Sequence, residues 1–146
     1  MIREITFDKK DVLGLTGLMN QWDDLPHEIT YENILEKLTK IKQINSKSAV
    51  FVAEINSRII GYAFLTEVLF LGMENFIELQ SILVDKNHRG KGIGKLLLLH
   101  SEKWIKKIGY HKIMLSSRVQ LENAHKFYTN MGYKISKQSY FFSKEL

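Results

Sequence analysis

The sequence predicts a single α/β domain, residues 1–146, built on a mixed β-sheet with helices on both of its faces. Segments rich in β-branched and aromatic residues alternate with segments in which apolar residues recur at helical spacing. The length of 146 residues, 45% of them hydrophobic, suffices for one core but not for two ordinary domains. No linker divides the chain, because Pro26 is the only proline and no serine- or glycine-rich run occurs.

The first half of the chain is predicted to form a strand, two helices and a β-hairpin. Asp8 or Asp11 can cap the first helix, and Ile34, Leu38 and Ile41 give the second helix its apolar period. The hairpin is indicated by two runs of β-branched and aromatic residues that flank the turn NSR. In chain order, these elements are expected at residues 3–7, 12–22, 30–42, 48–55 and 59–68.

The second half begins with a strand that ends in a nearly continuous apolar run, as expected of a buried strand. A helix that stops at Gly109 follows, and then a strand, a helix closed by Gly132 and a final pair of strands. These elements are expected at residues 75–84, 92–108, 112–117, 121–131, 133–136 and 139–146. The complete order is β-α-α-β-β-β-α-β-α-β-β.

Charge is distributed unevenly along a chain whose formal net charge is +5. Residues 1–84 carry a net charge of −4, whereas residues 85–112 carry +6. The basic segment indicates an anionic ligand, and the acidic first half favours a second, cationic partner.

Several classes of protein are disfavoured by the composition. Without cysteine, the chain has no disulfide, no thiolate zinc site and no cysteine nucleophile. The five histidines show no metal-binding spacing, so we expect no metal. The longest aliphatic runs are too short to span a bilayer, and the charged N-terminus does not resemble a signal peptide. We therefore expect a cytoplasmic protein without a membrane partner.

The stretch VDKNHRGKGIGKLLLL, residues 84–99, places three glycines where a strand gives way to a helix. Gly90, Gly92 and Gly94 weaken the start of this helix, because glycine costs about 1 kcal/mol relative to alanine inside a helix. A helix N-terminus offers backbone N–H groups that have no partner, and glycines let the backbone approach a bulky pyrophosphate. The stretch therefore predicts a ligand that carries phosphate.

Arg89 and Lys91 add positive charge to this loop, but two common phosphate-binding motifs do not fit it. The nucleoside-triphosphate loop requires serine or threonine after its Gly-Lys pair, whereas Leu96 follows Gly94 and Lys95. The dinucleotide fingerprint requires a third glycine at the position that Lys95 occupies.

Two segments together resemble a known family. Arg89, Gly92 and Gly94 match the pattern [QR]-x-x-G-x-[GA], and the segment NAHKFYTNMGY, residues 123–133, is similar to the family's downstream motif. The chain thus resembles the GNAT superfamily of acyl-CoA-dependent N-acyltransferases along nearly its whole length. The resemblance implies a mostly antiparallel, twisted sheet. It also implies transfer of an acetyl group from acetyl-CoA to a primary amine that attacks the thioester directly.

The resemblance assigns roles to individual residues. It implies that Tyr128 protonates or hydrogen-bonds the departing sulfur, although Tyr128 also lies in an apolar helical stripe and could be a core residue. It implies that the N–H of Ile82 polarises the thioester carbonyl. Asn123 is expected to begin its helix, cap it and bond the coenzyme. The acetyl-CoA site as a whole is expected to comprise Ile82, Leu83, Val84, Arg89, Gly90, Lys91, Gly92, Ile93, Gly94, Lys95 and Asn123.

Glu78 is the candidate general base. An amine must be neutral to attack a thioester, and a carboxylate in the strand before the glycine loop can accept its proton, directly or through a water. Alternation places Phe76, Glu78 and Gln80 on one face of the strand. The alternative is an ordinary charge on a strand.

The acceptor is expected to contact Trp22, Asp23 and Asp24, whose aromatic ring and carboxylates favour a cationic amine together with Glu28, Glu67 and Glu74. Two other functions stay open: an acyl-CoA-binding sensor without turnover, and a basic nucleic-acid-binding protein. The second is disfavoured because the cations follow one glycine loop and helix and no stacking array of aromatic residues accompanies them. The sequence is compatible with a homodimer but does not require one.

Overall fold

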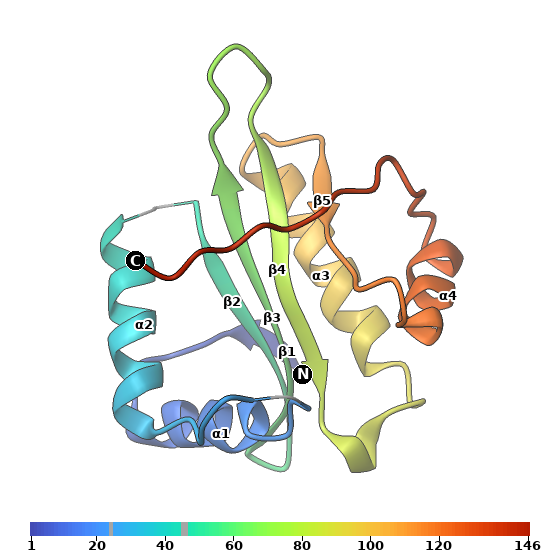
Figure 1. Cartoon of the computed structure of the whole chain (residues 1–146). Coiled ribbons are helices and arrows are strands. Elements are labelled where there is room, and N and C mark those ends of the chain that lie inside the picture. The colour runs from blue at the N-terminus through green and yellow to red at the C-terminus, as the bar shows by residue number, and fades with distance from the viewer. Residues whose placement is uncertain (24, 45–46) are drawn as a thin grey trace. The chain divides into compact units, whose positions relative to one another are not determined.

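The computed structural model describes residues 1–23, 25–44 and 47–146. The chain forms two compact units, Met1–Ser116 and Ser117–Leu146. In the described part of the chain, the first unit contains the β-sheet and three α-helices, and the second contains a fourth (Figure 1).

The sheet has five strands in the spatial order β1-β2-β3-β4-β5. Strands β1 to β4 pair antiparallel, and β5 runs parallel to β4. Two residues with left-handed backbone, Asn56 (φ 48°) and Ser57 (φ 63°), form the tight turn between β2 and β3. The strands are β1 Ile2–Glu4, β2 Ala49–Ile55, β3 Arg58–Val68, β4 Phe76–Val84 and β5 Ile113–Leu115.

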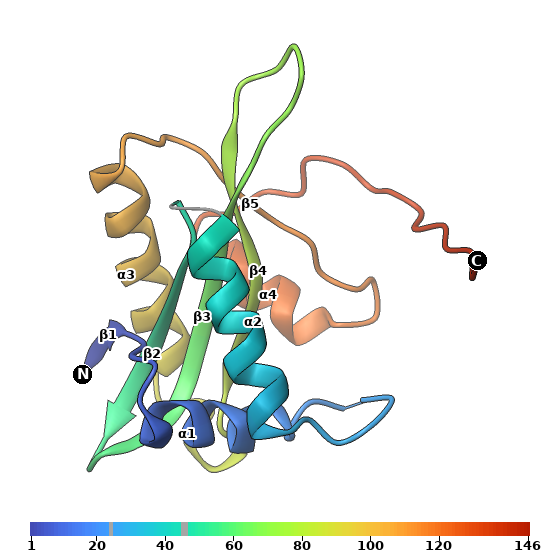
Figure 2. The same ribbon diagram turned by 90° about the vertical axis from the view of Figure 1, so that its left-hand side faces the viewer.

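Helices cover both faces of this sheet. α1, Lys9–Met19, and α2, Tyr31–Ile44, pack on one face, and α3, Ile93–Lys107, packs on the other (Figure 2). The prediction of a mixed, mostly antiparallel sheet between helices is therefore confirmed. The core under α1 and α2 is built from buried aliphatic side chains and one tyrosine: Ile5, Val12, Leu15, Leu18, Ile34, Leu38, Val50, Val52, Ile59, Tyr62 and Leu83.

The face under α3 is closed by aliphatic and aromatic contacts. Leu97 and Leu98 of α3 are fully buried. The ring of Phe51 in β2 makes edge-to-face contacts with His100, at a centroid distance of 4.6 Å, and with Trp104, at 5.7 Å. His100 is therefore part of the packing of this face.

A buried carboxylate joins the first strand to the first helix. Asp8 is the N-cap of α1 and accepts a hydrogen bond from the Asp11 N–H at 2.8 Å. Asp11 itself is 1% exposed and receives two hydrogen bonds from the Arg3 guanidinium, at 2.6 and 2.7 Å. Arg3 also donates to Glu54 of β2 at 2.7 Å. The hydrogen bonds from Arg3 hold the pKa of Asp11 well below its usual range.

The second unit contains α4, Glu122–Asn130, followed by a chain without regular secondary structure. The predicted strands at residues 133–136 and 139–146 are therefore wrong. A strand is stabilised by a neighbouring ladder and by burial of one face, and the described residues of this segment join no ladder. The strand prediction depended on the aromatic residues Tyr140, Phe141 and Phe142. These residues are 90%, 89% and 95% exposed, so they do not pack against a sheet.

Among the described residues, no helix has the length and apolar character needed to cross a membrane.

We expect Asp11→Ala to lower the free energy of unfolding by about 3 kcal/mol at pH 7, because it leaves Arg3 without its main partner at a buried site. The pKa of Asp11 is depressed by folding, so its stabilisation is complete above the unfolded value of 3.8 and is lost as the pH falls below it. The difference between wild type and variant should therefore shrink below about pH 4.

Urea unfolding at a series of pH values checks this. Glu36→Ala is the matched control, because Glu36 forms an exposed pair with Lys40 and should contribute less than about 0.5 kcal/mol. An equal loss for both variants would contradict a special role of Asp11.

Candidate active site

The glycine loop joins β4 to α3 in the conformation that its sequence predicts. Gly90 (φ 74°) and Gly92 (φ 79°) both have left-handed backbone, which favours glycine. A Cβ atom at either position would meet no other atom within 4 Å. These glycines are therefore required by the backbone conformation, and their open side lies free for a ligand.

The N-terminus of α3 presents unpartnered donors next to this loop. Gly92 is the N-cap, and the first bond within the helix runs from the Leu96 N–H to the Gly92 carbonyl at 3.0 Å. The N–H groups of residues 93–95 precede that bond and have no acceptor inside the helix. Glycine has no side chain with which to cap them. These donors and the positive end of the helix dipole suit an anion.

Two cationic side chains of the loop donate hydrogen bonds to backbone carbonyl groups within the same segment. The Arg89 Nε donates to the Val84 carbonyl at 3.1 Å, and the Lys91 Nζ donates to the Asn87 carbonyl at 3.0 Å. Both side chains, and that of Lys95 in the first turn of α3, are exposed. The loop is therefore positively charged on its solvent side.

The end of β4 has an open edge. β5 pairs with β4 only as far as Leu79, so in the described chain no strand covers this edge beyond that residue. The Asp85 N–H donates to the Ile60 carbonyl of β3. Alternation then directs the backbone groups of Leu83 towards β3 and those of Ile82 and Val84 towards the open edge. Ile82 and Val84 can thus pair with an extended ligand, whereas Leu83 packs its side chain into the core.

Asp85 holds the loop at this edge. The residue is 1% exposed. Its two carboxylate oxygens lie 2.9 Å from Gln21 Nε2, 3.0 Å from the Asn87 nitrogen and 2.8 Å from His88 Nδ1. Arg58 adds a longer ion pair at 3.5 Å. The hydrogen bonds from Gln21 and His88 lower the pKa of Asp85 to about 2. Asp85 is therefore an ionised, fully hydrogen-bonded carboxylate at neutral pH.

The connection after α1 is attached to the same loop. Gln21 donates to Asp85 and also accepts a hydrogen bond from the Lys86 N–H at 3.0 Å. The next residue, Trp22, donates from its indole to the Tyr62 hydroxyl at 3.2 Å. Asp23 is exposed, and the predicted site residue Asp24 lies outside the described residues. Gln21 thus ties the expected acceptor segment to the glycine loop.

Tyr62 joins Trp22 to β4. It is buried on the face under α1 and α2, opposite Leu83 in the ladder, and its hydroxyl also bonds Ser81. Burial raises the pKa of Tyr62, and its two hydrogen bonds partly oppose this. The phenol is therefore neutral at physiological pH and bonds the side chains of both Trp22 and Ser81.

Glu78 lies on this same face of β4. It pairs with Thr66 of β3, and its carboxylate accepts a hydrogen bond from Gln80 Nε2 at 2.7 Å. Ile77 and Leu79 are buried on the opposite face, as alternation predicted. The β3–β4 register shifts between Leu79 and Ser81, so Gln80 is the extra residue of a β-bulge. The bulge falls at the point where β5 leaves β4.

Tyr128 and Asn123 belong to the second unit. The ring of Tyr128 packs between Phe127 and Tyr133, at centroid distances of 5.2 and 5.9 Å, and burial raises its pKa. Asn123 does not cap α4: the N-cap is Leu121, and Asn123 is an exposed residue of the first turn. The predicted capping role of Asn123 is therefore wrong, because the helix begins before it.

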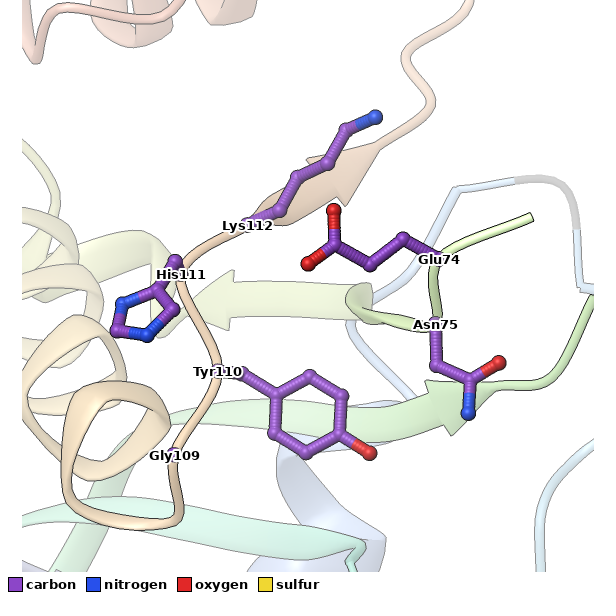
Figure 3. A pocket seen from close by; sticks show the side chains of 6 residues that line it. All are labelled: Glu74, Asn75, Gly109, Tyr110, His111 and Lys112. Atoms are coloured by element: carbon purple, nitrogen blue, oxygen red, sulfur yellow. The ribbon is translucent and has the colours of Figure 1, made fainter.

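Two of the acidic residues that the sequence groups with the acceptor lie elsewhere. Glu67 follows Thr66 and points to the opposite face of β3, where it accepts hydrogen bonds from Tyr110 and Lys47. Glu74 lines a separate pocket of about 450 Å³ beside the segment that leads into β5 (Figure 3). Figure 3 shows the Glu74 side chain extending towards that segment. The other lining residues are Asn75, Gly109, Tyr110, His111 and Lys112.

Sequence reasoning missed Gln21, Tyr62, Ser81 and Asp85. Only Asp85 carries a local signal, as the carboxylate that directly follows an apolar strand. The other three acquire their importance from partners elsewhere in the sequence; Gln21 and Asp85, for example, are 64 positions apart.

Comparison with known proteins identifies this arrangement. Residues 15–133 match the family described as "Acetyltransferase (GNAT) family". A segment of 57 residues is 46% identical to Uncharacterized N-acetyltransferase YhdJ of Bacillus subtilis (strain 168), covering 38% of this chain and 39% of that protein. A segment of 93 residues is 34% identical to the Aminoalkylphosphonate N-acetyltransferase of Salmonella typhimurium (strain LT2), covering 62% and 58%.

These matches span less than two thirds of either relative's length. Among solved structures, the aminoglycoside N-acetyltransferase AAC(6')-Iy in complex with CoA has the same fold, with a TM-score of 0.82 at 20% identity over 100% of this chain and 95% of that one. The family match covers most of the chain and includes the open edge of β4, the glycine loop and α4. The chain belongs to the GNAT family of acetyltransferases.

Proposed function

We propose that the protein transfers the acetyl group of acetyl-CoA to a primary amine. The observation that carries this proposal is the open edge of β4 running into a left-handed glycine loop and an uncapped helix N-terminus. An extended, amide-containing arm fits the first feature and a pyrophosphate the second. The proposal takes residues 1–146 as one domain, since the family match crosses the boundary between the two units.

The coenzyme would bind through backbone groups. Its pyrophosphate would accept hydrogen bonds from the N–H groups of Gly90 to Lys95, with Arg89, Lys91 and Lys95 supplying positive charge. Its arm would pair with Ile82 and with the Val84 N–H, because the Val84 carbonyl is already bonded to Arg89. Asn123, exposed on α4, would bond the arm or the phosphates. Leu83 would act by holding its neighbours in place.

The chemistry would be a direct acyl transfer. The neutral amine attacks the thioester carbonyl, a C–N bond forms and the C–S bond breaks. Glu78 accepts the proton of the amine, directly or through a water, and Tyr128 gives a proton to the departing thiolate. The Ile82 N–H stabilises the negative charge that develops on the carbonyl oxygen. The half-buried phenol of Tyr128 suits a proton donor, because partial burial raises its pKa and it carries its proton at physiological pH.

The acceptor would enter beside Trp22 and Asp23. Before it binds, its amine would be protonated and therefore cationic. Two relatives act on chemically different amines by their names, an aminoalkylphosphonate and an aminoglycoside. The two names support an amine as the class of acceptor. Which amine this chain acetylates depends on the residues of its own site.

Gly92→Ala should weaken CoA binding by tenfold or more, because a methyl group would project into the open side of the loop where the pyrophosphate lies. The left-handed backbone also costs a non-glycine residue about 1–2 kcal/mol of stability. Gly72→Ala is the matched control: Gly72 has φ 80° and open space, but lies in the β3–β4 turn. Both variants should lose a similar amount of their free energy of unfolding. Calorimetry should show a weaker CoA affinity for Gly92→Ala and an unchanged affinity for Gly72→Ala.

Glu78→Gln should lower kcat/KM by about 10²–10⁴-fold near neutral pH, the usual contribution of a general base. The deficit should narrow as the pH approaches the pKa of the acceptor amine, because more of the acceptor arrives deprotonated. Profiles of kcat/KM against pH with one amine measure this, and Glu74→Gln, in the separate pocket, should match wild type. Parallel profiles for wild type and Glu78→Gln would mean that Glu78 does not accept the proton.

Tyr128→Phe should lower kcat by about 10²-fold with little change in the KM for acetyl-CoA, because the lost proton donor acts on the departing thiolate in the transition state. Steady-state kinetics at a saturating amine concentration test it. Tyr133→Phe removes the hydroxyl of the adjacent ring and serves as the control. An unchanged kcat for Tyr128→Phe would assign Tyr128 to packing alone.

A further inference from the structure

A groove of about 350 Å³ lies between α2 and the sheet, outside the residues assigned so far. One wall is the side of α2 formed by Lys37, Lys40, Ile41 and Ile44, which follow each other at helical spacing. Phe64 of β3 forms an apolar part of the opposite wall. The groove is therefore apolar along its length, and the side chains of Lys37 and Lys40 form part of one wall.

One residue that lines the groove, Thr66, is the neighbour of Glu78 in the sheet. Ser48 and Thr66 both line the groove, and their hydroxyl oxygens are 2.7 Å apart. Thr66 is the ladder partner of Glu78, so both side chains lie on the same face with Cβ atoms roughly 4.5–5.5 Å apart. Ser48, Thr66 and Glu78 form a row across three neighbouring chain segments, a span of about 10 Å at the usual strand spacing.

Both lysines that line the groove are exposed to solvent. No carboxylate is among the described residues that line the groove. Lys40 pairs with Glu36, but both side chains are more than half exposed, and such a pair within a helix contributes little. An anion bound between Lys37 and Lys40 could therefore replace Glu36 as the partner of Lys40 at small cost.

We propose that this groove holds the body of the acceptor, and that the acceptor is a primary amine with an anionic group at the far end of an apolar chain. This inference rests on the proposed acetyl transfer. The amine would lie at Glu78, the chain against Ile41, Ile44 and Phe64, and the anionic group at Lys37 and Lys40. The acceptor is thus cationic only at its reacting end. Glu67 does not oppose this assignment, because its carboxylate is bonded to Tyr110 and Lys47 on the other face.

Acetylation kinetics with four straight-chain primary amines of one length test the proposal. Their far ends carry a carboxylate, a phosphonate, a methyl group or a second ammonium. We expect kcat/KM to be about tenfold higher for the two anionic acceptors than for the methyl-ended amine, the typical effect of a hydrogen bond to a charged group. The diamine should be poorest. Added salt should reduce these differences, because both lysines are exposed to solvent.

Variants of α2 assign the preference to the groove. The double variant Lys37→Gln/Lys40→Gln should lose the preference for anionic acceptors while keeping the rate with the methyl-ended amine. Lys37→Glu/Lys40→Glu should favour the diamine, and Glu36→Gln should strengthen the wild-type preference by freeing Lys40. Lys42→Gln is the control on the same helix, because the Lys42 Nζ lies over the Phe7 ring, 5.0 Å from its centroid.

Equal rates for the methyl-ended and anionic acceptors would overturn the inference, and so would a preference that survives in the double variants. A double variant that loses activity towards all four acceptors alike would also count against it. Failure of the underlying function looks different: no amine would be acetylated and no CoA thiol released by the wild-type protein.

Discussion

The buried carboxylate of Asp85 is the constraint on which the candidate site depends. A charge removed from water must be compensated by hydrogen bonds, and Asp85 has donors from Gln21, Asn87 and His88. With Asp85 ionised, the His88 Nδ1 must carry the proton of that contact, since a carboxylate can only accept. These bonds determine where the chain turns as it leaves β4. The glycine loop and the N-terminus of α3 take their positions from that turn.

The same carboxylate relates the two sides of the proposed reaction. Gln21, which bonds Asp85 and Lys86, immediately precedes Trp22, and Trp22 reaches Tyr62 on the sheet. The glycine loop and the segment that we propose to contact the acceptor are therefore joined by hydrogen bonds. These hydrogen bonds hold both segments in place before a ligand binds. Less conformational entropy is therefore lost on binding.

The architecture of β4 is compatible with the three roles proposed for it, towards the coenzyme, the base and the acceptor. Its first part, with Glu78, is paired on both sides, which holds that carboxylate in place on one face. Within the described residues, its last part is paired only with β3, so the backbone groups of Ile82 and the Val84 N–H face an open edge. The change occurs at the Gln80 bulge, and Gln80 itself bonds Glu78. The lysines of α2 line a groove on the same side of the sheet, although the first half of the sequence has a net negative charge.

Local patterns in the sequence determined most elements of the first unit and the family of the protein. Helices and strands are recognised from apolar side chains that recur every three to four or every two residues, so α1 to α4 and the hairpin could be predicted. The glycine loop could be predicted because glycine adopts a positive φ more readily than other residues. Only the tertiary structure decided which residues meet across long separations: Gln21 with Asp85, Trp22 with Tyr62, and Glu67 with Lys47 and Tyr110. It also decided that the aromatic C-terminal segment is not a strand pair. A strand depends on a ladder and a buried face supplied by other parts of the chain, and its own residues cannot specify that partner.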